Sequence, residues 1–212
     1  MATRISTLIF AFCSTCWAYF LIKTCQETWS VCQSHPDSYL FAWSAAVGAL
    51  LGLIIWKFFP FFLVLEHELT HFIAALLMFR RPIRLVVDQS GGEIVYEGRG
   101  STIIRLAPYF LPTFSLILLI SMPLFVSSVH RSIQIAIGVS WGYHLITGFI
   151  EGHPGQSDLR RGGLLASYLC AGSLGGIFYA TIAATTIGGW PLVKQWFHQS
   201  FNLALSVLTL ST

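Results

Sequence analysis

The segment that decides how this chain folds is residues 61–79, FFLVLEHELTHFIAALLMF. It is as apolar as the interior of a lipid bilayer, yet it contains two histidines and two glutamates. An ionisable side chain within a membrane span costs about 2.5–3.5 kcal/mol on insertion scales, so such groups are functional candidates by default. The segment therefore predicts a helix within a membrane that carries a polar site.

The composition of the whole chain agrees with a membrane protein. Of its 212 residues, 55% are hydrophobic and only 10% are charged, and the mean hydropathy is +0.70. A soluble domain carries about 25% charged residues. Several apolar runs reach the roughly 20 residues that cross a bilayer, and they are continuous rather than alternating, which favours helices over a β-barrel. We therefore expect an all-α polytopic membrane protein with about six transmembrane helices.

The expected spans are separated by short polar segments. The apolar run after Arg4 is long for a signal peptide and lacks a small-residue cleavage site, so we interpret it as an uncleaved span. Pro108 and Pro112 lie early in the fourth span, where they either kink or open it or are an ordinary tolerated pair of prolines. The tail either lies in the membrane interface or forms a short last span. The six expected spans cover residues 5–23, 38–56, 59–79, 103–128, 132–150 and 163–188.

One long polar segment, residues 80–102, interrupts the apolar pattern. Within it, IRLVV and EIVYE flank the sequence DQSGG. Short β-branched runs on either side of a glycine-containing turn are typical of a β-hairpin. We therefore expect a small hairpin insert over residues 83–99.

The positions of Lys and Arg predict the orientation of the chain. The net charge of +3 is small, and the arginines are spread between the apolar runs, which indicates the positive-inside rule rather than binding of nucleic acid. The basic excess places the hairpin and the 151–162 loop in the cytoplasm and the N-terminus outside. The richer set of loops contains Lys23, Arg80, Arg81, Arg84, Arg99, Arg105, Arg160 and Arg161, against Arg4, Lys57, Arg131 and Lys194 in the other set.

The sequence HELTH, residues 67–71, fits the motif H-E-x-x-H. His67 and His71 are four residues apart, so on a helix they project from one face, one turn apart. Two imidazoles in this arrangement can bind one zinc ion. Glu68 lies one step round the helix and could act as a general base on a metal-bound water. Glu66 lies on another face, where a supporting or purely structural role is expected.

A catalytic zinc ion usually takes three protein ligands and a water, so a third ligand must come from elsewhere. Asp158 and Glu151 lie together in EGHPGQSDLRRGG, with His144 and His153 close by in sequence. The other acids outside the motif are spread over the first loop, the start of the second span and the hairpin: Glu27, Asp37, Asp88, Glu93 and Glu97. Two interpretations without a metal stay open: a histidine pair hydrogen-bonded in a polar core, and an interfacial Asp158 paired with Arg160 or Arg161.

The motif within an apolar span, the hairpin-like insert, the proline-containing span and the distant Asp together resemble the site-2 protease family of intramembrane metalloproteases. The resemblance covers residues 58–175. It implies that Asp158, 87 residues after His71, is the third zinc ligand. The segment APYFLPTFSL stands where relatives carry a Gly-Pro-x-x-Asn-like element. Relatives often have an Asn close to the zinc-binding Asp, but no Asn lies near Asp158 in this sequence, so any hydrogen bond from that Asn must come from elsewhere. Gln156 or His144 could supply it.

This resemblance implies a zinc-dependent endopeptidase that cleaves within or near a transmembrane segment of another protein. Because a helix shields its peptide bonds, the substrate must unwind, and the hairpin edge could pair with the extended segment by strand addition. The expected organisation is N-terminal transmembrane helices over residues 1–57, a metalloprotease core over 58–175, and the end of the last span with an amphipathic or membrane tail over 176–212.

Two other functions stay open on the sequence. The first is a membrane zinc protease of the prenyl-protein type, in which Glu151 replaces Asp158 as a ligand. The second is a protein without catalysis that binds a metal ion or a membrane protein. His144 and His153 are expected to support the site rather than to bind the ion.

Overall fold

The computed structural model describes residues 26, 29–30, 33–88 and 91–209, so the expected span at 5–23 lies outside the described residues. Contacts divide the chain into two units, and each is treated by itself. One unit comprises Met1–Tyr39 with Ala183–Thr212, and the other comprises Leu40–Ile182. The whole of the HELTH motif and both acids of the 151–162 loop belong to the second unit. The division at residues 57 and 175 stays a prediction.

Four long helices, α2, α3, α6 and α8, agree with four of the expected spans. Each is long and apolar enough to cross a bilayer, and a bent pair of shorter helices makes a fifth candidate among the described residues. Helix α8 is longer than expected because it runs on to Thr209. Its backbone breaks at Gly189, where φ is 66°, before Pro191. The four helices are Ser38–Phe58 (α2), Pro60–Leu77 (α3), His130–Glu151 (α6) and Leu164–Thr209 (α8).

Helix α3 begins and ends through local signals in its sequence. Pro60 occupies the first turn, where its missing N–H leaves no intrahelical bond unmade. At the other end, Phe79 takes the left-handed conformation, with φ at 55°. The N–H of Arg80 then donates to the carbonyl of Ala75, which satisfies an otherwise free carbonyl of the last turn. This reversal directs the chain back along α3 as a strand.

The predicted hairpin is confirmed. Strand β1 (Pro82–Val87) pairs antiparallel with β2 (Gly92–Tyr96), and the register places Val87 opposite Gly92 and Leu85 opposite Ile94. The two strands form a two-stranded sheet, so the far edge of β2 has no partner strand among the described residues. Both strands contact α3, and the hairpin therefore lies beside the helix that carries the motif.

The fourth expected span is broken rather than kinked. The chain forms helix α4 (Thr102–Leu106), a 3-10 turn η1 (Ala107–Tyr109) and helix α5 (Thr113–Ser121), and then the short turns η2 (Met122–Leu124) and η3 (Ser127–Val129). The segments before and after the break differ in direction by 89°. Pro108 lies in the 3-10 turn and Pro112 precedes α5, and neither can donate the hydrogen bond that a continuous helix needs. Of the two interpretations, the structure therefore supports the one in which these prolines open the span.

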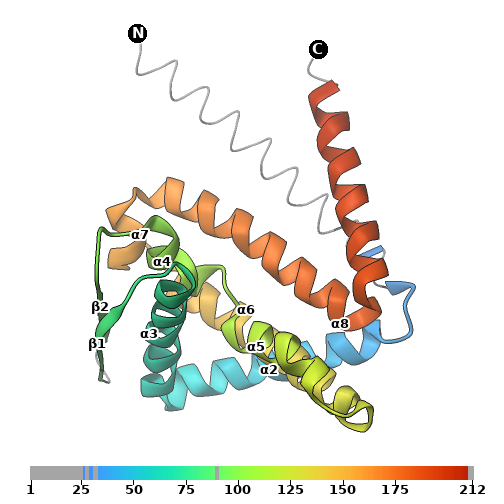
Figure 1. The fold of residues 1–212 in the computed structure, drawn as a ribbon, viewed down its shortest axis with the longest axis horizontal. Helices are drawn as coiled ribbons and strands as arrows, with labels where there is room; N and C mark the ends of the chain where they lie inside the picture. The colour runs from blue at the N-terminus through green and yellow to red at the C-terminus, as the bar shows by residue number, and fades with distance from the viewer. Residues whose placement is uncertain (1–25, 27–28, 31–32, 89–90, 210–212) are drawn as a thin grey trace. The chain divides into compact units, whose positions relative to one another are not determined.

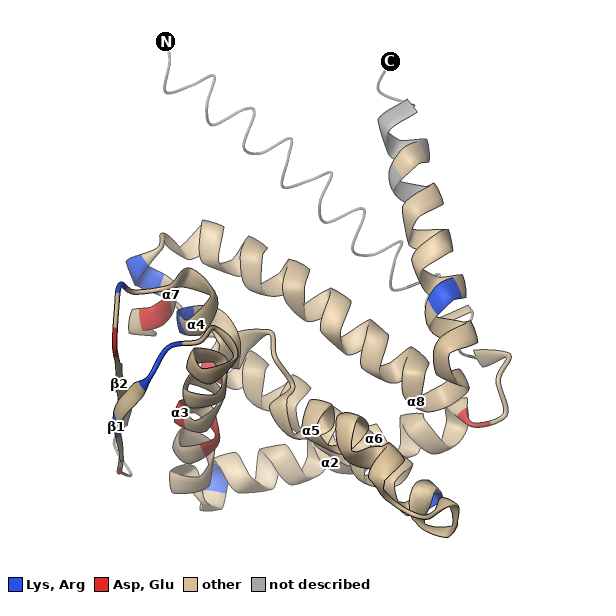
Figure 2. Cartoon of the chain, in the orientation of Figure 1, with Lys and Arg blue, Asp and Glu red and all other residues tan. Residues whose placement is uncertain are grey.

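Figure 1 shows that α3, the hairpin, α4 and the short helix α7 (Ser157–Arg161) gather at one end of the Leu40–Ile182 unit. A buried apolar cluster joins these elements, and it consists of Ala74, Ala75, Ile104, Leu106, Ala107, Phe110, Leu111 and Leu159. Figure 2 shows that charged residues lie mainly on α3, the hairpin, α4 and α7, whereas α2, α6 and α8 carry few. Large apolar side chains such as Trp43, Leu124 and Phe149 are exposed at 72%, 84% and 77%.

Candidate metal centre

The two histidines of the motif lie on one face of α3, as their spacing predicts. Their ring centroids are 5.0 Å apart, and both residues are buried, with 7% of His67 and 5% of His71 exposed. A buried imidazole needs polar partners because burial of an unpaired polar group is costly. The partners of these two rings therefore define the site.

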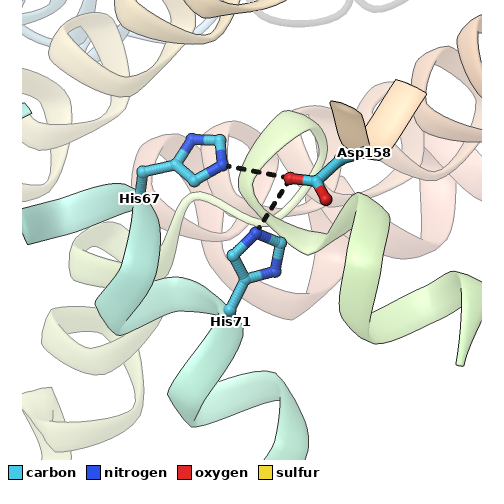
Figure 3. Close-up of side chains that lie close together, drawn as sticks. All are labelled: His67, His71 and Asp158. Atoms are coloured by element: carbon cyan, nitrogen blue, oxygen red, sulfur yellow. Dashed lines mark hydrogen bonds and ion pairs between the residues drawn. The ribbon is translucent and has the colours of Figure 1, made fainter. Parts of the chain in front are cut away.

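Asp158 reaches the histidines from α7, as Figure 3 shows. Its Oδ2 atom lies 3.2 Å from Nε2 of His71 and 3.6 Å from Nε2 of His67. Within the described part of the chain, His67, His71 and Asp158 form the one group of three residues whose ligand atoms could hold a metal ion, all within 4.8 Å of one another. The structure therefore brings Asp158 next to His71, although the two residues are 87 positions apart in the sequence.

A hydrogen bond to Asp158 and the packing of its neighbours hold this residue in place. The guanidinium of Arg105 on α4 donates a hydrogen bond to the main-chain carbonyl of Asp158. The neighbouring Leu159 is fully buried, and its carbonyl accepts a hydrogen bond of 2.9 Å from the hydroxyl of Ser167. Gly162 leaves room for Arg105, since a Cβ atom there would lie 2.3 Å from its Nη2 atom.

The second nitrogen of each histidine ring is also bonded. Nδ1 of His67 lies 3.0 Å from Oε2 of Glu151, the last residue of α6. Nδ1 of His71 lies 2.7 Å from the carbonyl oxygen of Ile104. Because a carboxylate and a carbonyl only accept hydrogen bonds, each Nδ1 atom carries the proton. In the neutral imidazoles, both Nε2 atoms then present lone pairs toward Asp158.

Three electron-pair donors thus face one another at Nε2 of His67, Nε2 of His71 and Oδ2 of Asp158. Such an arrangement requires a positive charge between them, either an extra proton on a histidine or a metal ion. Ligand atoms bound to one tetrahedral zinc ion at about 2.0–2.1 Å are about 3.3 Å apart, close to the 3.2 Å and 3.6 Å observed. Bonding of the outer nitrogen to a carboxylate or a carbonyl is also the usual support of a zinc-binding histidine. The three residues could therefore hold a metal ion.

The charge state of Asp158 suits a ligand. Burial raises the pKa of its carboxyl, but hydrogen bonds from His67 and His71, which require an extra proton on the imidazoles, outweigh burial and hold the pKa well below its usual range. The group is therefore ionised at neutral pH, as a metal ligand must be.

Glu68 lies at the wall of a cavity of about 890 Å³ that also contains both histidines and Asp158. None of the described residues forms a hydrogen bond with its carboxylate. Strand β2 approaches Glu68 so closely that a Cβ atom on Gly92 would lie 2.3 Å from Cγ of Glu68. The cavity continues along β2, where Ile94 and Tyr96 line it. Glu68 is thus free for chemistry in a space that an extended chain segment could enter.

The other sequence candidates fall into different places. Glu151 contacts the outer nitrogen of His67 rather than the position between the three donors. Arg160 donates a hydrogen bond to the carbonyl of Pro154 at 2.8 Å. In the described part of the chain, Asp158 forms no ion pair with Arg160 or Arg161. Gln156 precedes α7 and lines the cavity. His153 is exposed, and its Nδ1 atom accepts a hydrogen bond from the N–H of Gly155.

Glu66 and His144 meet on the opposite side of α3. Nε2 of His144 lies 3.4 Å from Oε1 of Glu66, and Nδ1 of His144 shares a hydrogen bond with the Tyr179 hydroxyl. The Thr70 hydroxyl lies 3.4 Å from Oε1 of Glu66 and 2.9 Å from the hydroxyl of Thr113. This buried network links α3 with α5, α6 and α8. Among the described residues, no hydrogen bond or ion pair joins Glu66 or His144 to His67, His71 or Asp158, which favours a structural role over a supporting one.

Three residues of the site had no signal strong enough to be found in the sequence. Arg105 was counted only as a basic loop residue, and Gly92 only as part of a turn. Tyr109 packs its ring against His67, with centroids 5.4 Å apart at an angle of 79°. The sequence feature that drew attention to this region was Pro108, which directly precedes Tyr109.

Compared with known proteins, the chain has no significant match to a family model, a curated sequence or a solved structure. The class of protein that the fold defines is therefore coarse: a largely helical chain with several helices long and apolar enough to cross a membrane. The site adds a group of two histidines and an aspartate that could hold a metal ion.

Proposed function

We propose that this chain is a zinc-dependent intramembrane endopeptidase that cleaves within or near a transmembrane segment of another protein. The observation that carries the proposal is the convergence of three electron-pair donors, from His67, His71 and Asp158, beside the unpaired carboxylate of Glu68. A site built only for stability would place a hydrogen-bond donor opposite each acceptor. The likeness of the motif and its spacing to the site-2 protease family agrees with the proposal.

A zinc ion bound to His67, His71 and Asp158 would polarise the substrate carbonyl and lower the pKa of a bound water. The chain's own residues then perform the proton transfers. Glu68 takes a proton from the water as its oxygen adds to the carbonyl carbon, and delivers that proton to the amide nitrogen as the C–N bond breaks. Glu151 and the Ile104 carbonyl hold both imidazoles in the tautomer that presents Nε2 to the ion.

The cavity supports an extended peptide as the substrate. The unpaired edge of β2 runs along it, and main-chain hydrogen bonds to such an edge are a common way to bind an extended segment. Gly92 brings this edge into contact with Glu68, so a segment paired with β2 would pass beside the proposed base. Helices that are long and apolar enough to cross a membrane support a site at membrane depth, where a transmembrane segment would supply such a peptide.

The test separates an enzyme from a binding protein. In Glu68→Gln, the three donors are intact, so the purified protein should bind zinc as tightly as the wild type. Cleavage of a fluorogenic transmembrane peptide in liposomes should fall at least about 10²-fold, because general-base catalysis typically contributes 10²–10⁴-fold.

The control is Glu97→Gln, which removes an exposed carboxylate that follows β2 and does not line the cavity, and which should change neither zinc binding nor cleavage. Equal cleavage by wild type and Glu68→Gln would refute the proposed role of Glu68. Zinc binding without cleavage of any transmembrane peptide by the wild type would favour the binding protein.

A further inference from the structure

The hydroxyl of Tyr109 is buried and has no hydrogen-bond partner. Almost all buried polar groups in native proteins have one, so each exception calls for an explanation. Of the buried side-chain atoms without a partner in the described residues, this hydroxyl alone belongs to the Leu40–Ile182 unit. It therefore marks a particular place in the unit that contains the candidate metal centre.

The ring of Tyr109 is held against the site. It meets the imidazole of His67 edge to face at 5.4 Å. The next residue, Phe110, stacks on Phe178 with ring centroids 5.8 Å apart, and the 3-10 turn after Pro108 fixes the backbone between them. The tyrosine is thus anchored by its neighbours and cannot turn away to find another partner without loss of packing.

The charges that act on the Tyr109 hydroxyl come from the site. They are the carboxylates of Asp158, Glu151 and Glu68. Glu151 already accepts a hydrogen bond from His67. Asp158 uses its Oδ2 atom toward both histidines, and no described residue donates to its Oδ1 atom.

The three candidate ligands therefore differ in the hydrogen bonds that support them from outside the metal site. His67 has Glu151 and His71 has the Ile104 carbonyl, but none of the described residues gives the Asp158 carboxylate an outer hydrogen bond. Carboxylates that bind a metal ion are usually hydrogen-bonded in turn, and loss of such a partner typically lowers metal affinity 10–100-fold. Among the described residues, the Tyr109 hydroxyl thus lacks a hydrogen-bond acceptor and the Asp158 carboxylate lacks an outer hydrogen-bond donor, and both groups belong to the same site.

We propose that Tyr109 is a positioning residue for the third ligand, whose hydroxyl donates a hydrogen bond to the Asp158 carboxylate when the site holds its metal ion. The proposal rests on the metal site of the proposed function, but not on peptide cleavage. It predicts that the hydroxyl contributes to metal affinity and contributes nothing to the stability of the metal-free protein.

The test uses Tyr109→Phe, which keeps the ring and removes only the hydroxyl. The full-length protein is purified in detergent, stripped with a chelator, and titrated with zinc alone by calorimetry, while its thermal unfolding is followed with and without zinc. We expect zinc affinity to fall about 10–100-fold. We expect the metal-free variant to unfold at the same temperature as the wild type or higher, because the removed hydroxyl is unpaired in that state.

The matched control is Tyr168→Phe, since the Tyr168 hydroxyl already donates to the carbonyl of Gly152 at 2.8 Å. Its zinc affinity should equal that of the wild type. Equal zinc affinity of Tyr109→Phe and the wild type, or a lower unfolding temperature of the metal-free variant, would overturn the role of Tyr109 and leave the proposed function untouched. A wild type that binds no zinc would refute the proposed function itself.

Discussion

Two glutamates on α3, only two residues apart, show how position decides the role of a residue. Glu66 faces the helix bundle and contacts His144 and Thr70, so its carboxylate serves packing. Glu68 points to the cavity, where its carboxylate has no partner among the described residues and the strand at Gly92 presses against it. The H-E-x-x-H spacing distinguished the two in the sequence, because only Glu68 lies between the histidines.

Asp158 and Glu151 are the two acids that compete for the role of third ligand, and separate substitutions distinguish them. Asp158→Asn removes one of the three donors and should abolish zinc binding at micromolar zinc. Glu151→Gln removes only the outer partner of His67, so zinc should still bind, about 10–100-fold more weakly. The measurement is the zinc content of purified protein after equilibration at several zinc concentrations. The reverse order of losses would assign the ligand to Glu151.

Gly92 is predicted to be required for the position of Glu68. In Gly92→Ala, the new methyl group would lie 2.3 Å from Cγ of Glu68, so the side chain or the strand must move. A displacement of the base should lower the cleavage rate at least about 10-fold, while zinc affinity stays unchanged, because small misplacements of reacting groups are costly. The rate and the zinc affinity are measured on the same preparation.

Gly91→Ala is the matched control for Gly92→Ala, because a Cβ atom on Gly91 meets nothing within 4 Å. It should cleave at the rate of the wild type. Equal cleavage rates of Gly91→Ala and Gly92→Ala would show that the close approach of β2 to Glu68 does not affect catalysis.

At the scale of elements, glycines set the distance between α2 and α6. A Cβ atom on Gly142 would lie 1.9 Å from the carbonyl oxygen of Ala45, and one on Gly48 would lie 1.8 Å from that of Val139. Small residues that let two backbones touch are typical of helix pairs in membranes.

Gly142→Ala is therefore expected to force α2 and α6 apart and to destabilise the fold by about 1–3 kcal/mol, the usual cost of overpacking. Gly148→Ala on the same helix is the control, because a Cβ atom there meets nothing within 4 Å. It should be neutral or stabilising through its higher helix propensity. Unfolding in detergent, followed by circular dichroism, compares the two. Equal stability of both variants would contradict the assigned contact.

The helices and strands also show which structural features sequence patterns can predict and which they cannot. Apolar length and continuity predicted α2, α3 and α6 within a few residues, and β-branched runs around a glycine turn predicted the hairpin. Prolines indicated that the fourth span could be interrupted, but did not predict the 89° change of direction. That angle depends on how Phe110 and Leu111 pack in the core, which is a long-range property that no local pattern contains. The same limit explains why Tyr109 could not be placed against His67.

The candidate site was predictable where its geometry follows from one helix. His67, His71 and Glu68 share a helix turn, so their spacing was sufficient. Asp158 came from a resemblance, since no physical rule derives which distant acid a fold will bring to a histidine pair. Glu151 was correctly included as a nearby acid, but its contact with the outer nitrogen of His67 depends on where α6 ends.

At the scale of the whole molecule, orientation in the membrane stays a prediction from the Lys and Arg counts. With native cysteines replaced, a cysteine introduced by Phe79→Cys, directly after α3, should react with a membrane-impermeant maleimide from the cytoplasmic side. One introduced by Phe59→Cys, between α2 and α3, should react from the opposite side. These two positions lie at opposite ends of α3. Labelling of both from one side would show that α3 does not cross the membrane.

The central claim, that His67, His71 and Asp158 together hold a zinc ion, is tested most directly by X-ray absorption at the zinc edge on the purified full-length protein. The account predicts one zinc ion per chain with two imidazole nitrogens and at least one carboxylate oxygen at about 2.0–2.2 Å, and loss of this spectrum in Asp158→Asn. A wild-type protein that holds no zinc after loading at neutral pH, or a zinc ion with a single imidazole ligand, would contradict it.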